Sequence, residues 1–257
     1  MPFLNPFAYL LAALVGASVG SFLNVCVYRL PRGESVVNPG SRCPGCGYPV
    51  RWHDNLPVFG YLALRGRCRD CGGRISPRYP LVEIATAALW VAAVALHGVG
   101  WEGLASAVLF TLLLGIALTD AASYTIPDLF TWGGLALGLA LAWVRPEITF
   151  WQSLGGAALG FGLLFMVGVV GEWLFRKPAM GGGDIKMMAM VGSFLGPVGV
   201  VLTIFLGALL GTLIFTPITL VTKKLVPFGI FLALGGLGTA VWGDALIGWY
   251  LRTLWLG

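Results

Sequence analysis

Residues 7–27 read FAYLLAALVGASVGSFLNVCV, a run of 21 residues without one charged side chain. A helix needs roughly 20 mostly apolar residues to cross the hydrocarbon core of a bilayer. Of the 257 residues in the chain, 58% are hydrophobic and only 11% are charged, whereas a soluble globular domain carries about 25% charged residues. So few charges cannot cover a surface that faces water. The sequence therefore indicates an integral membrane protein whose main solvent is lipid.

Further apolar runs predict an all-α, polytopic transmembrane bundle of about eight spans. The runs are continuous, which favours helices over the alternating strands of a β-barrel. A cleaved signal peptide is the alternative for the first run, but no positive residue precedes it and arginines follow it, which favours a retained helix with its N-terminus outside. The expected spans are residues 7–27, 81–96, 104–118, 129–144, 151–174, 187–201, 202–221 and 228–255.

Two glycine-containing pairs interrupt these runs. Gly196-Pro197 predicts a break between the sixth and seventh spans, and Gly243-Asp244 predicts an interruption of the last one. The one long polar segment lies between the first and second spans. We therefore divide the chain into a first transmembrane helix (1–30), a cytoplasmic four-cysteine loop (31–79) and a transmembrane core (80–257).

Basic residues are concentrated in the polar loop. Nine arginines lie between Arg29 and Arg78, and the positive-inside rule places such a segment in the cytoplasm. Only Arg145 and Arg252 oppose the rule in an eight-span model. Topology and anionic lipid headgroups account for the basic pI of about 9.1, so we expect no nucleic-acid partner. If the chain crosses the membrane at each later span in turn, the following residues lie on the cytoplasmic side: Asp120, Asp128, Arg176, Lys177, Lys186, Lys223 and Lys224.

The loop contains two C-x-x-C pairs, Cys43 with Cys46 and Cys68 with Cys71, each followed by a glycine. Two such turns can offer four thiolates to one tetrahedral Zn²⁺. Two disulfides or four free thiols are the alternatives, and the reducing cytoplasm disfavours disulfides. Because four sulfur ligands leave no open position, we expect a structural zinc site that stabilises a loop without a sizeable core.

Two aspartates stand where expected spans reach the cytoplasm. Asp120 follows the run 104–118, and Asp184 follows three glycines just before the next span. Ionisable residues at membrane depth are costly and mark functional sites, and glycines let a backbone approach a substrate closely. A helix cap is the alternative for Asp184, and a simple boundary position for Asp120. The expected substrate loop consists of Gly181, Gly182, Gly183 and Lys186.

Two carboxyl groups held together suit acid–base hydrolysis. They do not both ionise easily, so one keeps its proton and the pair titrates jointly. The charged group takes a proton from water, and the neutral group hydrogen-bonds the scissile carbonyl. A transporter with buried acids and a non-enzymatic scaffold with a zinc docking loop are the other function classes. Acids at span ends and the lack of an internal repeat favour the hydrolytic enzyme over both.

The sequence resembles the bacterial type IV prepilin peptidases, membrane aspartic proteases with a Gly-x-Gly-Asp motif. The resemblance covers nearly the whole chain. It rests on motifs in the same order: Gly20-Ser21-Phe22-Leu23-Asn24-Val25, Tyr28-Arg29-Leu30-Pro31, the four-cysteine loop with Asn55-Leu56-Pro57, Arg78-Tyr79-Pro80-Leu81-Val82-Glu83, Asp120 with Ile126-Pro127-Asp128, and Gly181-Gly182-Gly183-Asp184-Ile185-Lys186.

The resemblance implies that Asp120 and Asp184 are the catalytic pair. The implied substrates are prepilins or pseudopilins, whose short basic leader is cut after a glycine at the cytoplasmic face of the bacterial inner membrane. It also implies methylation of the new N-terminus with S-adenosylmethionine, an activity associated with the N-terminal half. Asn24, Asn55 and Glu83 are the candidate substrate-binding or methyl-donor-binding residues.

Overall fold

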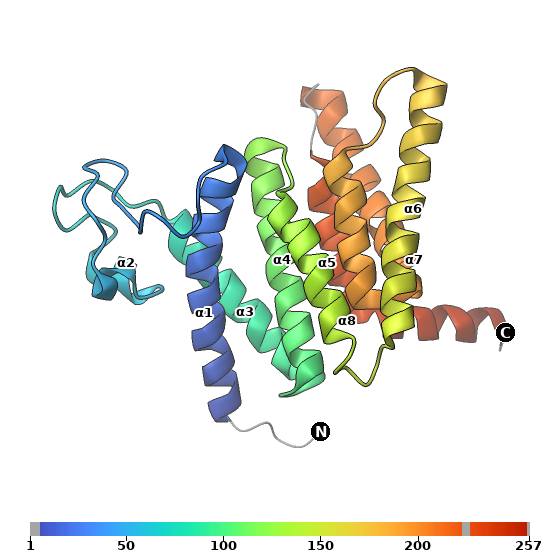
Figure 1. Ribbon diagram of the computed structural model, residues 1–257, viewed down its shortest axis with the longest axis horizontal. Helices are drawn as coiled ribbons and strands as arrows, with labels where there is room; N and C mark the ends of the chain where they lie inside the picture. Colours follow the sequence, from blue (N-terminus) through green and yellow to red (C-terminus); the bar gives the residue numbers. More distant parts are fainter. Residues whose placement is uncertain (1–5, 223–226, 256–257) are drawn as a thin grey trace. The chain divides into compact units, whose positions relative to one another are not determined.

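The computed structural model describes residues 6–222 and 227–255, with side chains for 6–214 and 227–253. Lys223 and Lys224 lie outside the described residues. The regular elements of the described part are all helices, and its only β-structure is two isolated bridges in the cysteine loop, which confirms the all-α class. The helices are α1 (Pro6–Arg29), η1 (Leu30–Arg32), η2 (Trp52–Asn55), α2 (Phe59–Ala63), α3 (Arg78–His97), α4 (Trp101–Ser123), α5 (Asp128–Leu141), α6 (Phe150–Phe175), α7 (Gly182–Thr222) and α8 (Phe228–Trp255) (Figure 1).

Six helices in the described residues are long and apolar enough to cross a membrane: α1, α3, α4, α6, α7 and α8. Helix α5 is apolar but has only 14 residues. The expected break in α7 is confirmed, because Gly196 has non-helical angles of φ 69° and ψ −176°. Eight spans would require α5 and both arms of α7 to be counted, so the count of about eight stays a prediction.

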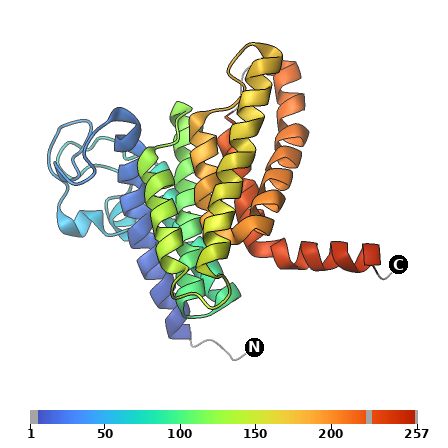
Figure 2. The same ribbon diagram turned by 45° about the vertical axis from the view of Figure 1, so that its right-hand side comes forward.

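Helix α8 differs from its prediction. It continues as a helix through Gly243 and Asp244, so the interruption expected there is wrong. Helical hydrogen bonding tolerates an isolated glycine, at a cost of about 1 kcal/mol relative to alanine. The last turns of α8 nevertheless run at an angle to its first turns, as Figure 2 shows.

Arg145, which opposes the charge pattern, has a structural partner. Its guanidinium donates a hydrogen bond to the carbonyl of Phe194 at 2.9 Å. Phe194 lies just before the break at Gly196, where a helix end leaves carbonyls without an intrahelical partner. Arg145 therefore stabilises the end of the first arm of α7.

The chain forms two compact units, residues 1–111 and 112–257. In the first unit α1 packs against α3 through two glycines one turn apart. A Cβ added to Gly16 would lie 2.8 Å from Trp90 Cβ, and one added to Gly20 would lie 2.8 Å from Glu83 Cα. Small residues at this spacing let membrane helices approach closely. The three-part division expected from the sequence stays a prediction.

In the second unit the first arm of α7 is packed on two sides. Gly156 and Gly160 of α6 meet the α7 backbone at Gly192 and Met188, so closely that a Cβ on either glycine would clash. On another side, a Cβ added to Gly134 of α5 would lie 2.7 Å from a methionine sulfur of α7. These contacts fix the arm that begins with the predicted catalytic loop.

Candidate active site and metal-binding cluster

The two predicted catalytic aspartates come from different helices of the second unit. Asp120 lies in the last turn of α4 and is only 6% exposed. Asp184 lies in the first turn of α7, because this helix begins at Gly182 and not near residue 187 as expected. Its N–H donates to the carbonyl of Gly181 at 3.1 Å. Ile126 lies against Gly183, the residue before Asp184, and also against Gly229, which lies beside Asp120 Oδ2, so the structure brings the two aspartates into one neighbourhood.

Ile126 lies between the helices that carry the site. A Cβ added to Gly183 would lie 2.9 Å from Ile126 Cβ, and one added to Gly229 would lie 2.9 Å from Ile126 Cδ1. The same Cβ on Gly229 would lie 2.7 Å from Asp120 Oδ2. Ile126 therefore packs against the starts of α7 and α8 beside Asp120. Sequence reasoning missed Gly229, whose only signal was a glycine at the start of the last span.

The three glycines before Asp184 are not equivalent. A Cβ on Gly181 would lie 2.8 Å from Asp184 Oδ2, whereas a Cβ on Gly182 would meet no atom within 4 Å. Gly183 packs against Ile126 as described above. A Cβ at Gly183 would therefore press on Ile126 and one at Gly181 on the Asp184 carboxyl group, whereas Gly182 has open space for a side chain.

Two oxygen atoms of this site are exceptional. Among the described residues, the buried side-chain N or O atoms without a hydrogen-bond partner are Asp120 Oδ2 and Asp184 Oδ1. Buried polar groups are nearly always paired, and leaving one unpaired costs about 1–3 kcal/mol. Both predicted catalytic carboxyl groups thus present an unused acceptor.

Lys186 has a carboxylate partner in the second unit. Its Nζ lies 2.6 Å from Asp128 Oδ1 at the start of α5. Asp128 is 64% exposed, so the pair is solvated and contributes little to stability. The pair joins the starts of α5 and α7 near Asp184. A substrate role for Lys186 stays a prediction.

The four cysteines of the loop form one cluster. The Sγ atoms of Cys43, Cys46, Cys68 and Cys71 all lie within 4.8 Å of one another, and none is in a disulfide. Cys43 Sγ and Cys71 Sγ are 3.8 Å apart, close to the roughly 3.8 Å between sulfurs bound tetrahedrally at about 2.3 Å. Backbone N–H groups of Cys46, then of Gly45, lower the pKa of Cys43 to about 7. The cluster can hold a metal ion.

The two C-x-x-C turns have matching backbones. Gly47 N–H donates to Cys43 O at 2.8 Å, and Gly72 N–H donates to Cys68 O at 2.9 Å. Both glycines have left-handed φ angles, 72° and 68°, which glycine adopts without steric cost. Each turn thereby directs its two cysteines to the same point.

An ion pair attaches the second turn to η2. Arg69 donates from Nε and Nη2 to the two carboxylate oxygens of Asp54, at 2.8 and 2.6 Å. This bidentate hydrogen bonding lowers the pKa of Asp54 and raises that of Arg69. The loop is therefore ordered by polar contacts in place of an apolar core.

The three candidate binding residues of the first unit have different surroundings. Asn24 is buried and donates to the carbonyl of Tyr79 at 3.1 Å, which ties α1 to the start of α3. Glu83 is buried and accepts a 2.7 Å hydrogen bond from the N–H of Val58. Asn55 is exposed and lines a hollow beside α1.

The structure thus defines a polytopic helical membrane protein with paired carboxyl groups at a helix end and a four-cysteine loop. Two family models match the chain: the bacterial peptidase A24 N-terminal domain over residues 14–97, and the type IV leader peptidase family over residues 107–216. The chain belongs to the type IV leader peptidase family, as the sequence motifs predicted. The transporter and scaffold alternatives are not supported.

Curated relatives agree with this assignment. The chain is 35% identical to the type 4 prepilin-like proteins leader peptide-processing enzyme of Escherichia coli, over 89% of this chain and 92% of that protein. It is 35% identical to the prepilin leader peptidase/N-methyltransferase of Pseudomonas aeruginosa, over 96% of this chain and 95% of that protein. With the Myxococcus xanthus protein of that name it shares 42% identity, over 71% of this chain and 54% of that protein. No solved structure matches the chain.

Proposed function

We propose that this chain is a membrane aspartic endopeptidase that removes the leader peptide of prepilins or pseudopilins, with Asp120 and Asp184 as its catalytic pair. The names of the relatives supply the substrate class. The observation that carries the residue assignment is the pair of buried, unpartnered oxygens, Asp120 Oδ2 and Asp184 Oδ1. We propose that these free oxygens bind the attacking water and the scissile carbonyl group of the substrate.

The two carboxyl groups divide the work of hydrolysis. In the resting pair one carboxyl is ionised and the other keeps its proton, because two close negative charges repel each other. The ionised carboxylate accepts a proton as water attacks the scissile carbonyl carbon. The protonated carboxyl donates a hydrogen bond to the carbonyl oxygen as negative charge develops there, and a proton passes to the leaving amine as the C–N bond breaks. The apparent pKa values belong to the pair.

The charge distribution favours cleavage at the cytoplasmic face of the inner membrane. The arginine-rich loop follows the positive-inside rule, and threading the spans places both aspartates on the same side as that loop. The leader of a prepilin is short and basic in the family that the sequence resembles, and basic segments stay in the cytoplasm. Substrate and catalytic pair would therefore meet without the leader crossing the bilayer.

The cysteine cluster is proposed to hold Zn²⁺ in a structural role. Thiolates are soft ligands that suit zinc, and four of them complete its tetrahedral coordination. The ion would join the turns at Cys43 and Cys68 and so set the shape of the loop. The relatives named N-methyltransferase support a second activity, methylation of the new N-terminus with S-adenosylmethionine.

One experiment tests both activities. The protein, purified in detergent micelles, is incubated with a prepilin and S-adenosylmethionine carrying a deuterated methyl group, and the product N-terminus is examined by mass spectrometry. We expect a cleaved product that carries the labelled methyl group. An uncleaved prepilin would contradict the peptidase proposal, and a cleaved but unmethylated product would contradict the methyltransferase proposal alone.

A further inference from the structure

One stretch of the arginine-rich cysteine loop is almost free of charge. Residues 52–64, called here the apolar loop segment, read WHDNLPVFGYLAL, with His53 and Asp54 as the ionisable side chains. Arg51 and Arg65 flank the segment on its two sides. An apolar stretch of about 10–14 residues is too short to span a bilayer and forms a core helix or a re-entrant or interfacial segment.

The apolar loop segment turns its large side chains outward, so it is no core helix. Trp52 is 80% exposed, Phe59 67% and Leu62 63%. Phe59 and Leu62 are three residues apart in α2, so they lie on the same side of this short helix. The residue that α2 buries is Gly60, which packs against the carbonyl of Asp54. An exposed apolar cluster of this kind marks contact with another protein or with a membrane.

Two contacts give the depth of the segment along α1. The carboxyl group of Glu83 accepts the N–H of Val58 at 2.7 Å. A Cβ added to Gly20 would lie 2.8 Å from Glu83 Cα, so Glu83 lies at the level of Gly20. Gly20 precedes Arg29, the last residue of α1, by about 13 Å along the helix axis. Val58 is therefore close to the level at which α1 passes through the hydrocarbon core, which is about 30 Å thick.

The two ribbon views agree with this depth. In Figures 1 and 2 the short helix α2, in light blue, lies at the height of the middle of α1 and not beyond its end. Both elements belong to the first compact unit, residues 1–111. The segment thus lies beside a membrane span, where its outward side chains face lipid.

The backbone of the segment is paired as lipid requires, because an unpaired N–H group is costly where no water is present. The N–H of Gly60 donates to the carbonyl of Leu56 at 2.8 Å, and that of Leu62 donates to the carbonyl of Val58 at 3.1 Å. The N–H of Val58 precedes the helix, and the buried carboxyl group of Glu83 accepts it. The one acid of the segment is held in the bidentate arginine pair described above.

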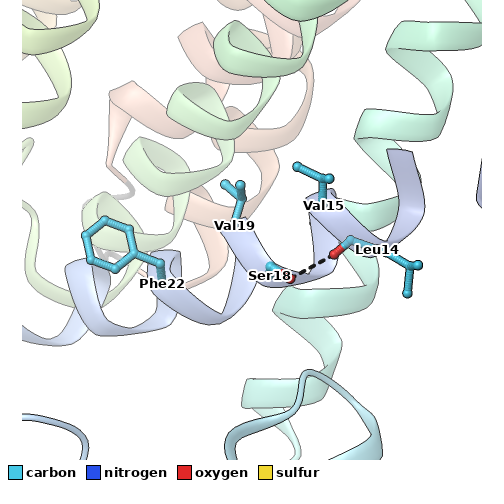
Figure 3. Close-up of a pocket in the computed structure, with 5 residues that line it drawn as sticks. All are labelled: Leu14, Val15, Ser18, Val19 and Phe22. Carbon is cyan, nitrogen blue, oxygen red and sulfur yellow. Dashed lines mark hydrogen bonds between the residues drawn. The ribbon is translucent and has the colours of Figure 1, made fainter. Parts of the chain in front are cut away.

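The face of α1 next to the segment is also apolar. A hollow of about 440 Å³ on this helix is lined by Leu14, Val15, Ser18, Val19 and Phe22 (Figure 3). The hydroxyl of Ser18 donates to the carbonyl of Leu14 at 2.9 Å, the dashed line in Figure 3, so this donor is used within the helix. Ser18 and Phe22 also line a second hollow, of about 380 Å³, which extends to Asn55 and Pro57. Lipid chains that contact α1 can therefore reach the segment.

We propose that the apolar loop segment is inserted into the cytoplasmic leaflet of the bilayer without crossing it, and that it binds anionic phospholipid there. Phe59 and Leu62 contact acyl chains, and Trp52 takes the interfacial position that tryptophan favours. Arg51 and Arg65 extend to the phosphate groups, since arginine keeps its charged end in the interface while its stem lies along apolar surface. This anchoring does not depend on the proposed peptidase activity.

Lipid accounts for more of these features than another partner does. In water the exposed side chains of Trp52, Phe59 and Leu62 would be unfavourable. A protein partner would cover those side chains but would not require an arginine at each end of the segment, whereas the anionic headgroups of the cytoplasmic leaflet attract both arginines. Insertion holds the cysteine loop against the membrane at a third place, besides α1 and α3.

Photo-crosslinking tests the contact directly. The amino acid p-benzoylphenylalanine, which reacts with nearby C–H bonds on irradiation, replaces Phe59 or Leu62 in the full chain. The protein is placed in nanodiscs of phosphatidylethanolamine and phosphatidylglycerol, and mass spectrometry of the intact chain measures lipid adducts. Leu10, 57% exposed on α1, is the lipid-facing control. Glu34, exposed and beyond the end of α1, is the water-facing control. An unchanged thermal unfolding midpoint checks the fold of each variant.

We expect the yield of lipid adduct at Phe59 and Leu62 to be within about twofold of that at Leu10, because acyl chains surround all three positions, and the yield at Glu34 to be far lower. Yields at Phe59 and Leu62 no higher than at Glu34 would overturn the proposal. Adducts to a second copy of the chain, or to a prepilin added to the nanodiscs, in place of lipid would overturn it in favour of a protein partner.

The flanking arginines have their own test. Arg51→Gln combined with Arg65→Gln removes two charges and should lower the lipid adduct at Phe59 at least about twofold, because each arginine near the surface is attracted to anionic headgroups. Arg42→Gln combined with Arg74→Gln removes two exposed charges elsewhere in the loop and is the matched control, with no expected change. An unchanged yield in the first pair, or an equal loss in both pairs, would refute the role of Arg51 and Arg65.

Discussion

The glycines before Asp184 provide a sharp test of the site geometry. A Cβ on Gly183 would lie 2.9 Å from Ile126 Cβ, whereas non-bonded carbons prefer about 3.5–4.0 Å. Ile126 or the start of α7 must move by about 0.6 Å or more to accept alanine. Because α7 carries Asp184 one residue further on, this movement displaces the carboxyl group. Gly182 differs, because a Cβ there meets no atom within 4 Å.

The expected magnitudes follow from these distances. A misplacement of about 1 Å in an active site costs up to about 100-fold in rate, so we expect Gly183→Ala to lower kcat/KM by about 10- to 100-fold. Gly229→Ala should be at least as damaging, because its Cβ would lie 2.7 Å from Asp120 Oδ2. A substitution in open space stays within about 0.5 kcal/mol, so Gly182→Ala should change kcat/KM by about twofold or less.

The assay is cleavage of a prepilin by each variant in detergent micelles, with initial rates read by mass spectrometry. Gly238→Ala in α8 is the matched control for Gly229→Ala, since its Cβ would have an ordinary 3.5 Å contact with Leu206. Metal content and thermal unfolding of each variant report whether it is folded. Equal loss of activity in Gly182→Ala and Gly183→Ala would refute the packing argument, and so would native activity in Gly183→Ala.

Three further predictions concern the metal, an ion pair and pH. Elemental analysis should find one zinc ion per chain, and less in Cys43→Ser, because three thiolates hold the ion less tightly; equal zinc content would contradict the cluster. Lys186→Asp reverses one charge of the pair and should lower kcat/KM by up to about fivefold, as expected for an exposed ion pair. Adding Asp128→Lys should restore kcat/KM. A double variant that stays slow would indicate that Lys186 contacts the substrate directly. Arg69 lowers the pKa of Asp54, so the contribution of this ion pair to loop stability is complete above about pH 4 and is lost as the pH falls through the lowered pKa. Limited proteolysis should therefore show that the loop opens in acid. Asp54→Asn should remove that pH dependence.

The sequence was most informative where the physics is local. A span is a contiguous run of apolar residues, so the positions of most helices followed from composition. A C-x-x-C turn is equally local, and both turns fold as the spacing indicated. The position of Asp120 at the membrane boundary followed from its place at the end of one apolar run. Predicting that Asp120 and Asp184 lie together also required the family motifs, because no local pattern in either segment indicates which distant residue it approaches.

What escaped prediction depends on contacts between distant segments. Helix α7 starts at Gly182, and Gly183 in its first turn packs against Ile126, whereas a glycine-rich stretch alone predicts a loop. Gly229 looked like an ordinary residue at the start of a span until its Cβ position was seen to meet Asp120 Oδ2. The hydrogen bond that Glu83 accepts from the N–H of Val58 joins residues 25 positions apart, and no local pattern in the sequence indicates it.

The most direct test of the central claim is prepilin cleavage by Asp120→Asn and Asp184→Asn, each inserted in the membrane and measured beside the native chain. Asparagine has nearly the same shape but neither accepts nor donates a proton as a carboxyl group does, so each variant should lose at least about 100-fold in rate. Asp244→Asn, an exposed acid in α8, is the matched control and should cleave normally. Normal cleavage by either Asp120→Asn or Asp184→Asn would contradict the assignment of the catalytic pair.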